Sequence, residues 1–565
     1  MHFGMMFFVL STLLLQLSFA QSGRIPVRAK EGMVVSSHHL ASQAGRDILK
    51  QGGNAIDAAI ATAFALAVVH PSAGNIGGGG FMVYHGIDGT VTAFNFREKA
   101  PLASTETMYL DENGDVKNRS NHIGILAVSV PGTVAGLHLA HERLGNKSWQ
   151  ELLTPAIKLA EDGFQISYGL SRGMRRVSNR AQDKFPSTLK VFMKNGGENY
   201  EAGDTWRQTD LAATLKRIQE NGKDGFYQGK TAELIVKFMK ENDGIINKED
   251  LEKYQAKEQK PIHGTYRGYD IYAMSPPSSG GIALVEMLNI LEGYNLKKIE
   301  HNSAHYLHLL TEAMRRAFSD RAQYIGDPDF NPNMPIAKLT SKEYAAELRE
   351  DIQMYQASKS KAEVFNQISE SMETTHFSVV DKDGNTVSLT YTLEFGYGSG
   401  IVVEGAGFLL NNEMGDFNAI PGRTDSTGII GTTPNLIAPE KRMLSSMTPT
   451  IVAKDGKPIL AIGSPGGRTI INTVLQVVLN VIDHEMNIAM AIESERIHHQ
   501  WLPDVTRFER YGFSPDTKKM FEMYGHRIGY RGSQGSAMGI YIDWENGVIY
   551  GAADTRSYDG AAVGY

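Results

Sequence analysis

The sequence contains no cysteine. This absence excludes disulfide bonds, thiolate metal sites and a cysteine nucleophile. The chain also lacks blocks of lysine and arginine and basic patches interleaved with aromatic residues, and its formal net charge is −7. A nucleic-acid-binding surface requires such basic patches, so the composition argues against nucleic acid as a partner.

Long hydrophobic runs are also scarce. The run at 55–69 carries Asp57 and is too short to span a bilayer, so we expect a buried helix there. The run at 5–17 is followed by Ser-Phe-Ala at 18–20, which is the pattern of a cleavable signal peptide. We therefore predict that residues 1–20 are removed and that the chain is secreted or periplasmic, with no membrane span afterwards. Because the leader lacks lysine and arginine, an uncleaved anchor is the alternative.

With 565 residues, of which 42% are hydrophobic, the chain can bury a large core, in about two to four domains or in one composite domain. Helical periodicity occurs at 37–51, 54–69, 132–144, 149–162, 208–221, 230–242, 303–324, 468–483 and 486–494. Alternation typical of strands occurs at 33–36, 80–86, 90–97, 376–381, 386–393, 450–453, 458–462, 538–543 and 547–552. This mixture predicts sheets layered between helices.

A polar linker changes abruptly into an alternating strand at residue 374. Residues 351–373 have little sustained apolar patterning, whereas apolar and polar residues alternate from Phe377 to Tyr391. A strand that begins on threonine directly after a linker is typical of a chain that cuts itself and exposes a new N-terminal nucleophile. We therefore predict cleavage between Glu373 and Thr374.

The turn of this hairpin predicts its register. A three-residue loop ending on Gly384, which supplies positive φ, would close the hairpin on Asp381 and Asn385 and place Thr374 opposite Thr392. Thr374 could then attack a carbonyl with its own α-amino group as base, while the Thr392 hydroxyl orients it. Opposed threonines also simply pack or share a hydrogen bond in many sheets, so the hairpin alone leaves both interpretations open.

Further motifs accompany the hairpin along the chain. They are 52–59 (GGNAIDAA), 77–81 (GGGGF), 96–98 (FRE), 129–133 (SVPGT), 374–376 (TTH), 390–392 (TYT), 410–417 (LNNEMGDF), 444–450 (LSSMTPT) and 463–467 (GSPGG). In this order they resemble the γ-glutamyltranspeptidase (γ-glutamyltransferase) family over nearly the whole mature chain. Several motifs in order are far more specific than any one of them.

The resemblance implies a fold and an activity. The fold is α+β, the four-layer αββα sandwich of N-terminal nucleophile hydrolases, autoprocessed into a large subunit, 21–373, and a small subunit, 374–565, that form one composite domain. The activity is transfer of the γ-glutamyl group of glutathione and related γ-glutamyl compounds to water or to an amino acid or dipeptide acceptor. It proceeds through a γ-glutamyl-Thr374 enzyme and implies no cofactor and no metal.

A γ-glutamyl group carries an α-carboxylate and an α-ammonium, so its recognition requires cationic and hydroxyl donors as well as carboxylates. The resemblance implies a carboxylate site made of Arg97, Ser445 and Ser446. It implies an ammonium site made of Glu394, Glu413 and Asp416. Apart from the resemblance, these residue types more often form a surface ion pair, a turn and a solvated face. We expect Arg97 to contact only the substrate's α-carboxylate.

Gly466 and Gly467 are implied as the oxyanion hole, because small residues let backbone N–H groups converge on a developing oxyanion. A Pro-Gly turn that feeds a helix is equally compatible with these residues. Two positions depart from the best-known family pattern. Glu394 stands where many members carry asparagine, which makes the ammonium site more acidic. Thr427, within a possible lid at 421–435, stands where a tyrosine would latch the lid, so the sequence does not predict lid closure.

Two other motifs predict no cofactor site. The glycine run at 77–80 lacks the Gly-Lys-Ser/Thr of a phosphate loop. Glu495, His498 and His499 lack the spacing of zinc or di-iron ligands, and we interpret the histidines as structural.

Three alternative functions remain open at this point. A poly-γ-glutamate (capsule) depolymerase and a cephalosporin acylase share the same superfamily. A non-catalytic relic that binds amino acids belongs to another class, and it would remain an uncut chain.

Overall fold

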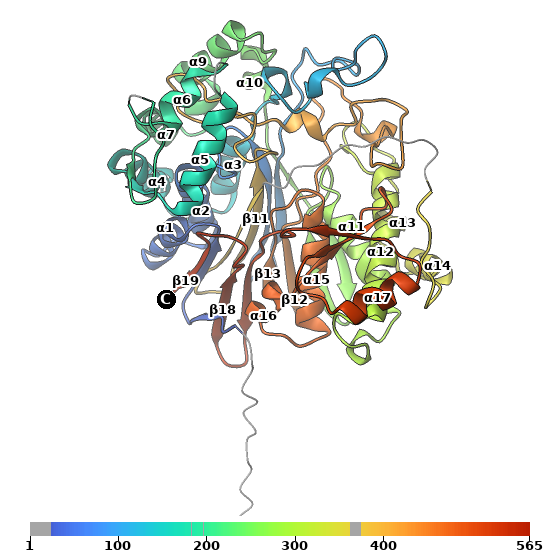
Figure 1. The fold of residues 1–565 in the computed structure, drawn as a ribbon. Coiled ribbons are helices and arrows are strands. Elements are labelled where there is room, and N and C mark those ends of the chain that lie inside the picture. The colour runs from blue at the N-terminus through green and yellow to red at the C-terminus, as the bar shows by residue number, and fades with distance from the viewer. Residues whose placement is uncertain (1–23, 182–183, 196, 362–373) are drawn as a thin grey trace, which may run out of the picture.

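The computed structural model describes residues 24–361, apart from 182, 183 and 196, and residues 374–565. Two seven-stranded sheets lie face to face in the centre of the molecule, with helices α1–α7 on one side and α11–α17 on the other (Figure 1). This arrangement confirms the predicted αββα sandwich. The predicted signal peptide, 1–20, and Glu373 lie outside the described residues.

The first sheet combines strands from distant parts of the chain, and every pairing in it is antiparallel. In spatial order its strands are β19 (Ala561–Gly564), β2 (Met33–Ser36), β10 (Thr375–Val380), β11 (Thr386–Thr392), β3 (Gly79–His85), β4 (Val91–Phe96) and β7 (Lys257–Gln259). Its outer helices are α1 (His39–Lys50), α2 (Ala55–Val69), α3 (Thr133–Leu144), α4 (Trp149–Asp162), α5 (Tyr168–Ala181), α6 (Pro186–Phe192), α7 (Thr209–Asn221), α8 (Asp224–Tyr227), α9 (Gly229–Glu241) and α10 (Lys248–Lys253). Every residue of α2 is buried, as predicted for 55–69.

The second sheet packs on the first through a small apolar cluster that includes Phe81 and Val83 on one side and Met274 and Ile451 on the other. In spatial order its strands are β1 (Val27–Ala29), β18 (Val548–Ala553), β17 (Met538–Asp543), β13 (Lys457–Ile462), β12 (Thr450–Lys454), β9 (Tyr269–Ala273) and β8 (Ile262–Tyr266). Its outer helices are α11 (Gly280–Glu292), α12 (Ala304–Tyr324), α13 (Ile336–Leu339), α14 (Lys342–Glu350), α15 (Thr469–Ile482), α16 (Ile488–Glu493) and α17 (Pro515–Met523).

Two smaller sheets complete the fold. One contains β14 (Ile497–His498), β15 (Thr506–Glu509) and β16 (Ile528–Arg531), and the other contains β5 (Phe164–Gln165) and β6 (Thr205–Trp206). Among the residues that the structure describes, no helix is long and apolar enough to cross a membrane.

The hairpin β10–β11 has the predicted register. Thr375 pairs with Tyr391 and Val380 with Thr386, so the pairing continues to Thr374 opposite Thr392. At the turn, Gly384 has φ 95° and its N–H donates to the Asp381 carbonyl at 3.1 Å. The Asp381 carboxylate also accepts from the Ala55 N–H at 3.0 Å, which ties the turn to the start of α2.

The turn glycine supplies a test of this register. Gly384→Ala would strain a positive φ and bring a Cβ within 2.4 Å of Trp544, whereas Gly456→Ala, at φ 76° in the β12–β13 turn, meets nothing within 4 Å. We expect Gly456→Ala to lower the free energy of unfolding by about 1–2 kcal/mol and Gly384→Ala by about 1–3 kcal/mol more. Equal losses in urea unfolding would contradict this account of the turn.

Candidate active site

A cavity of about 880 Å³ opens where the two sheets meet the loops that follow β11 and β13. Every residue predicted for the site, except Gly466 and the undescribed Glu373, lines it: Thr374, Thr392, Gly467, Arg97, Glu394, Glu413, Asp416, Ser445 and Ser446. A volume of this size is typical of pockets that enclose a small peptide or cofactor. The fold therefore brings together residues separated by up to 370 positions.

Thr374 stands at the start of β10 with its hydroxyl directed at Thr392. Its Oγ1 donates to the Thr392 Oγ1 at 3.3 Å, and the same Thr392 oxygen accepts from the Glu394 N–H at 2.9 Å. The Asn75 amide donates to the Thr392 carbonyl at 2.9 Å, which fixes the end of β11. The Thr374 hydroxyl is therefore positioned by Thr392, which is itself fixed by hydrogen bonds from Glu394 and Asn75.

The glycine run at 77–80 explains how the backbone reaches this position. A Cβ on Gly78 would lie 2.1 Å from the Thr392 carbonyl oxygen, and a Cβ on Gly80 would lie 2.4 Å from the Thr390 carbonyl oxygen. Only glycine permits so close an approach of β3 to β11. The run therefore serves packing beside the threonine pair.

Gly466 and Gly467 form the turn that precedes α15, with φ 134° and 58°. Their carbonyls accept from the N–H groups of Thr469 and Ile470 at 3.2 and 3.1 Å. Within the described residues, neither glycine N–H donates a hydrogen bond to the protein. Two unused N–H groups in a turn beside the cavity are suited to an oxyanion.

Arg97 is fully buried and contacts three carboxylates. Its guanidinium lies 2.6 Å from Glu413 and 3.3 Å from Glu98, and it also pairs with Asp416. The expectation that Arg97 contacts only a substrate carboxylate is therefore wrong. The sequence could not reveal this, because Glu413 and Asp416 reach Arg97 only through the fold.

The carboxylates outnumber the cations in this part of the cavity. Burial raises the pKa of Glu98 to about 7, against the lowering effect of Arg97. Burial also raises the pKa of Glu413 and Glu394 well above the usual range, and the neighbouring charge of Asp416 raises both further. Such a group of buried acids gains a counter-charge when a cation binds, so the site is suited to an ammonium.

Ser446 is positioned by an arginine that the sequence did not single out, and Ser445 is positioned by its own chain. Arg321, on α12, donates from Nη2 to the Ser446 Oγ at 3.0 Å and from Nε to the Ser279 Oγ at 2.8 Å. The Ser445 Oγ accepts from the Met447 N–H at 3.1 Å. Each site hydroxyl thus accepts one bond and keeps its own proton to donate.

His122 is a second residue of the cavity that the sequence did not indicate. Its Nδ1 lies 2.9 Å from the Glu394 carboxylate, and its ring stacks on Phe395 with centroids 5.1 Å apart. It lies in a polar stretch without a motif, so no pattern marked it.

The segment 421–435 borders the cavity through Thr427 and its neighbours. The Thr427 hydroxyl donates to Asp425, in the same segment, at 2.5 Å. Thr427 therefore bonds within its own loop.

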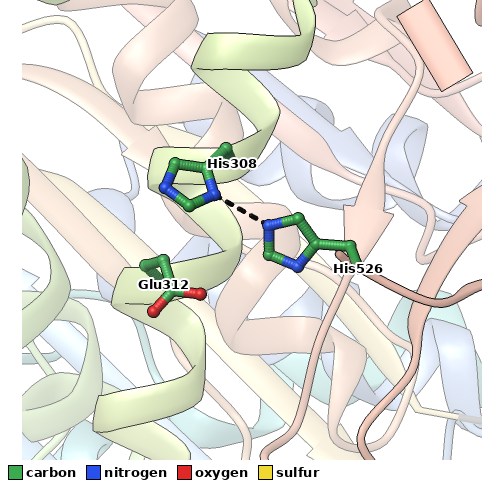
Figure 2. Close-up of side chains that lie close together, drawn as sticks. All are labelled: His308, Glu312 and His526. Carbon is green, nitrogen blue, oxygen red and sulfur yellow. Dashed lines mark hydrogen bonds between the residues drawn. The ribbon is translucent and has the colours of Figure 1, made fainter. Parts of the chain in front are cut away.

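A second cluster of titratable side chains lies outside the cavity (Figure 2). Figure 2 shows the His308 and His526 rings turned toward each other, with Nδ1 and Nε2 2.8 Å apart, and Glu312 one turn along the same helix as His308. His308 also bonds through Nε2 to the Gln353 carbonyl at 2.9 Å, and Glu312 pairs with Arg316 at 2.7 Å. Because both ring nitrogens of His308 are hydrogen-bonded and the Glu312 carboxylate is already paired with an arginine, we assign the cluster a structural role.

A family model described as Gamma-glutamyltranspeptidase matches residues 41–564. The chain is 47% identical, over 96% of its length and 93% of the relative's, to "Glutathione hydrolase proenzyme" of Escherichia coli (strain K12). Among solved structures it resembles cephalosporin acylase from Bacillus halodurans, with TM-score 0.85, 30% identity and coverage of 97% and 98% of the two chains. It also resembles Helicobacter pylori gamma-glutamyltranspeptidase, with TM-score 0.56, 48% identity and coverage of 57% and 92%.

The ion pairs of Arg97 predict a stability effect. Arg97→Ala would leave buried carboxylates without their counter-ion, so we expect the free energy of unfolding to fall by about 3–5 kcal/mol at neutral pH. Adding Glu413→Gln removes one of those charges and should restore part of the loss. Urea unfolding of the single and double variants checks this, and a double variant no more stable than Arg97→Ala would refute it.

Proposed function

The chain belongs to the gamma-glutamyltranspeptidase family, and we propose that it acts through Thr374 as an N-terminal nucleophile. It is an enzyme made as a proenzyme and cleaved autocatalytically, and it transfers the γ-glutamyl group of glutathione and related compounds to water or to an amine. The observation that carries the residue assignment is the Thr374–Thr392 hydroxyl contact inside the cavity that also contains Arg97 and the buried acids.

The proposed cleavage between Glu373 and Thr374 yields a large subunit, 21–373, and a small subunit, 374–565. The structure supports this division, because Thr374 lies at the cavity wall directly before β10, whose pairing with β11 begins at Thr375 and needs no residue before Thr374. Arg97 and Glu98 then come from the large subunit, and the ammonium-site acids and the two serines come from the small subunit.

In the proposed reaction, the freed α-amino group of Thr374 accepts the proton of its own hydroxyl as Oγ1 attacks the γ-carbonyl carbon. The N–H groups of Gly466 and Gly467 donate to the oxyanion of the tetrahedral intermediate. Collapse expels the amine of the leaving group, which takes the proton, and leaves a γ-glutamyl ester on Thr374. Water, or the amino group of an amino acid or dipeptide, then attacks the ester and regenerates the hydroxyl.

We assign the α-carboxylate of the γ-glutamyl group to hydrogen-bond donors and its α-ammonium to carboxylates. Its α-carboxylate accepts from Ser445 and Ser446, whose hydroxyl protons are available, and from Arg97, which it shares with the acids already paired to that guanidinium. Its α-ammonium lies among Glu394, Glu413 and Asp416. The α-ammonium of the substrate thereby supplies the counter-charge that these buried acids lack.

The likeness to a cephalosporin acylase supports a second candidate, an acylase acting on other acyl groups. The buried acids favour a donor with an α-ammonium, and this requirement distinguishes a γ-glutamyltransferase from an acylase that acts on other acyl groups. A chromogenic γ-glutamyl anilide should release its amine, faster with a dipeptide acceptor, while the same donor without the α-amino group and poly-γ-glutamate should react far more slowly. Preference for the deaminated donor would favour the acylase.

We also propose that residues 1–20 export the chain as a signal peptide. The support is the apolar run at 5–17 with small residues after it.

Processing is the first test of the nucleophile. The mature protein should contain two unequal fragments, the smaller beginning Thr-Thr-His-Phe. Thr374→Ala should remain one inactive chain, because the hydroxyl that attacks the preceding peptide bond is gone. Thr375→Ala is the matched control and should still be cut, since the Thr375 hydroxyl bonds to Ser37 at 2.8 Å instead of facing Thr392. A small fragment that begins at Thr375 would move the nucleophile by one residue.

The raised pKa values predict how substrate binding depends on pH. Glu394 and Glu413 must be ionised to hold an ammonium, and their raised pKa values mean that protons return at a higher pH than for an ordinary carboxyl group. We expect KM for the anilide to rise on acidification by up to about tenfold per pH unit for each proton. Glu394→Gln should raise KM at high pH and make its dependence on pH shallower. A KM that is constant from pH 5 to 9 would contradict the ammonium assignment.

A further inference from the structure

The cavity has walls of opposite charge. Arg97 and the acids occupy one part, whereas Arg468, Arg507 and Arg531 line the same cavity from the turn before α15 and from the β14–β16 sheet. No lysine lines the cavity among the described residues, so its cations are guanidinium groups. The planar guanidinium donates two parallel hydrogen bonds to a carboxylate, which an ammonium cannot do.

The register of the small sheet turns two of these arginines to one face. β15 and β16 are parallel, with Arg507 opposite Gly529 and Glu509 opposite Arg531. Side chains at paired positions and at alternate positions share a face, so Arg507 and Arg531 are diagonal neighbours. Gly529 leaves room for the Arg507 stem, whose Cγ lies 3.6 Å from the place a Cβ would take.

Glu509 shares this face but is already neutralised. It accepts from Arg556 at 2.6 and 2.8 Å and from the N–H groups of Arg496 and Gln534 at 3.0 and 2.8 Å. Within the residues that the structure describes, no carboxylate lies within 4.0 Å of the Arg507 guanidinium. The positive charge of Arg507 is therefore not cancelled by Glu509, the acid nearest to it in register.

The third arginine connects this wall to the reaction centre. Arg468 directly follows Gly467, the residue whose N–H we assign to the oxyanion. The γ-glutamyl group uses Arg97, the serines and the acids, so the part of the donor beyond the scissile amide must occupy the remaining cavity. In that part the charged groups are predominantly cationic.

We propose that Arg468, Arg507 and Arg531 form a subsite for the terminal carboxylate of the peptide attached to the γ-glutamyl group. This inference rests on the proposed function. Transfer to a peptide is the reverse of acylation by a γ-glutamyl peptide, so the incoming amine occupies the place that the leaving amine vacated. The same arginines therefore bind the carboxylate of a peptide acceptor. The preferred donors are γ-glutamyl peptides with a free terminal carboxylate.

Two donors that differ by one charge test the subsite. Values of kcat/KM are measured for glutathione and for its glycine amide with the cleaved enzyme. We expect the parent enzyme to prefer glutathione by roughly tenfold to hundredfold, as one or two charge-assisted bonds would provide. Arg507→Ala and Arg531→Ala should each reduce this ratio toward one, and Arg507→Lys should retain part of it. Arg527→Ala, an exposed arginine beside β16 that does not line the cavity, is the matched control and should keep the parent ratio.

The acceptor is tested with the neutral γ-glutamyl anilide as donor. Glycylglycine should accelerate amine release more than its C-terminal amide in the parent enzyme, and the difference should shrink in Arg507→Ala and Arg531→Ala. A parent ratio near one, or variants that lose both donors equally and so keep the ratio, would overturn the proposal. A parent enzyme that cleaves neither glutathione nor the anilide would instead refute the proposed function.

Discussion

Thr374 reaches the cavity because β10 pairs with its neighbours in a single register. Side chains alternate between the two faces of a strand, so a slip of one residue would bring Thr375 to the position of Thr374. β10 lies between β2 and β11, and Val379 pairs with Val34 on one side and Val387 on the other. Both faces of the strand are buried, so each slipped register would misplace apolar residues on both sides. The position of Thr374 in the cavity thus depends on the packing of apolar residues farther along β10, such as Val379.

The charges of the cavity suit a zwitterionic ligand. A buried arginine with three carboxylates is costly by itself, because desolvation exceeds what one cation returns. A ligand that carries a carboxylate and an ammonium leaves the net charge of the cavity unchanged and places its ammonium beside the acids. Binding then offsets a desolvation cost already present in the fold, whereas a ligand with a carboxylate alone would add to the excess of negative charge.

The sequence predicted the elements whose signals are local. Gly384 and its neighbours predicted the hairpin, and the capping pair Asn54 and Asp57 marks the start of the helix expected at 54–69. The helical periodicity of the sequence did not predict α11, because nearly every residue of that helix is buried and no polar face makes the 3.6-residue pattern visible. Arg321 was missed for a different reason: Ser446 lies 125 residues away, and only the fold joins them. The hairpin itself indicates Thr374 and Thr392, whereas the other site residues follow from the family resemblance, since their types alone suggest surface groups or turns.

The strand order explains why cleavage is compatible with one intact domain. β10 and β11, after the proposed cleavage point, lie between β2 and β3, which precede it, and β19 returns to the outer side of β2. Strands from the two proposed subunits are therefore neighbours in the sheet, and each keeps its ladder of hydrogen bonds when the linker is cut. Separation of the pieces would break these three ladders and also the β1–β18 and β9–β12 ladders of the second sheet, and it would open the cores under α2 and α11. The described ladders begin at Thr375, so loss of the peptide bond before Thr374 can free the amino group that the proposed mechanism requires without breaking any of them.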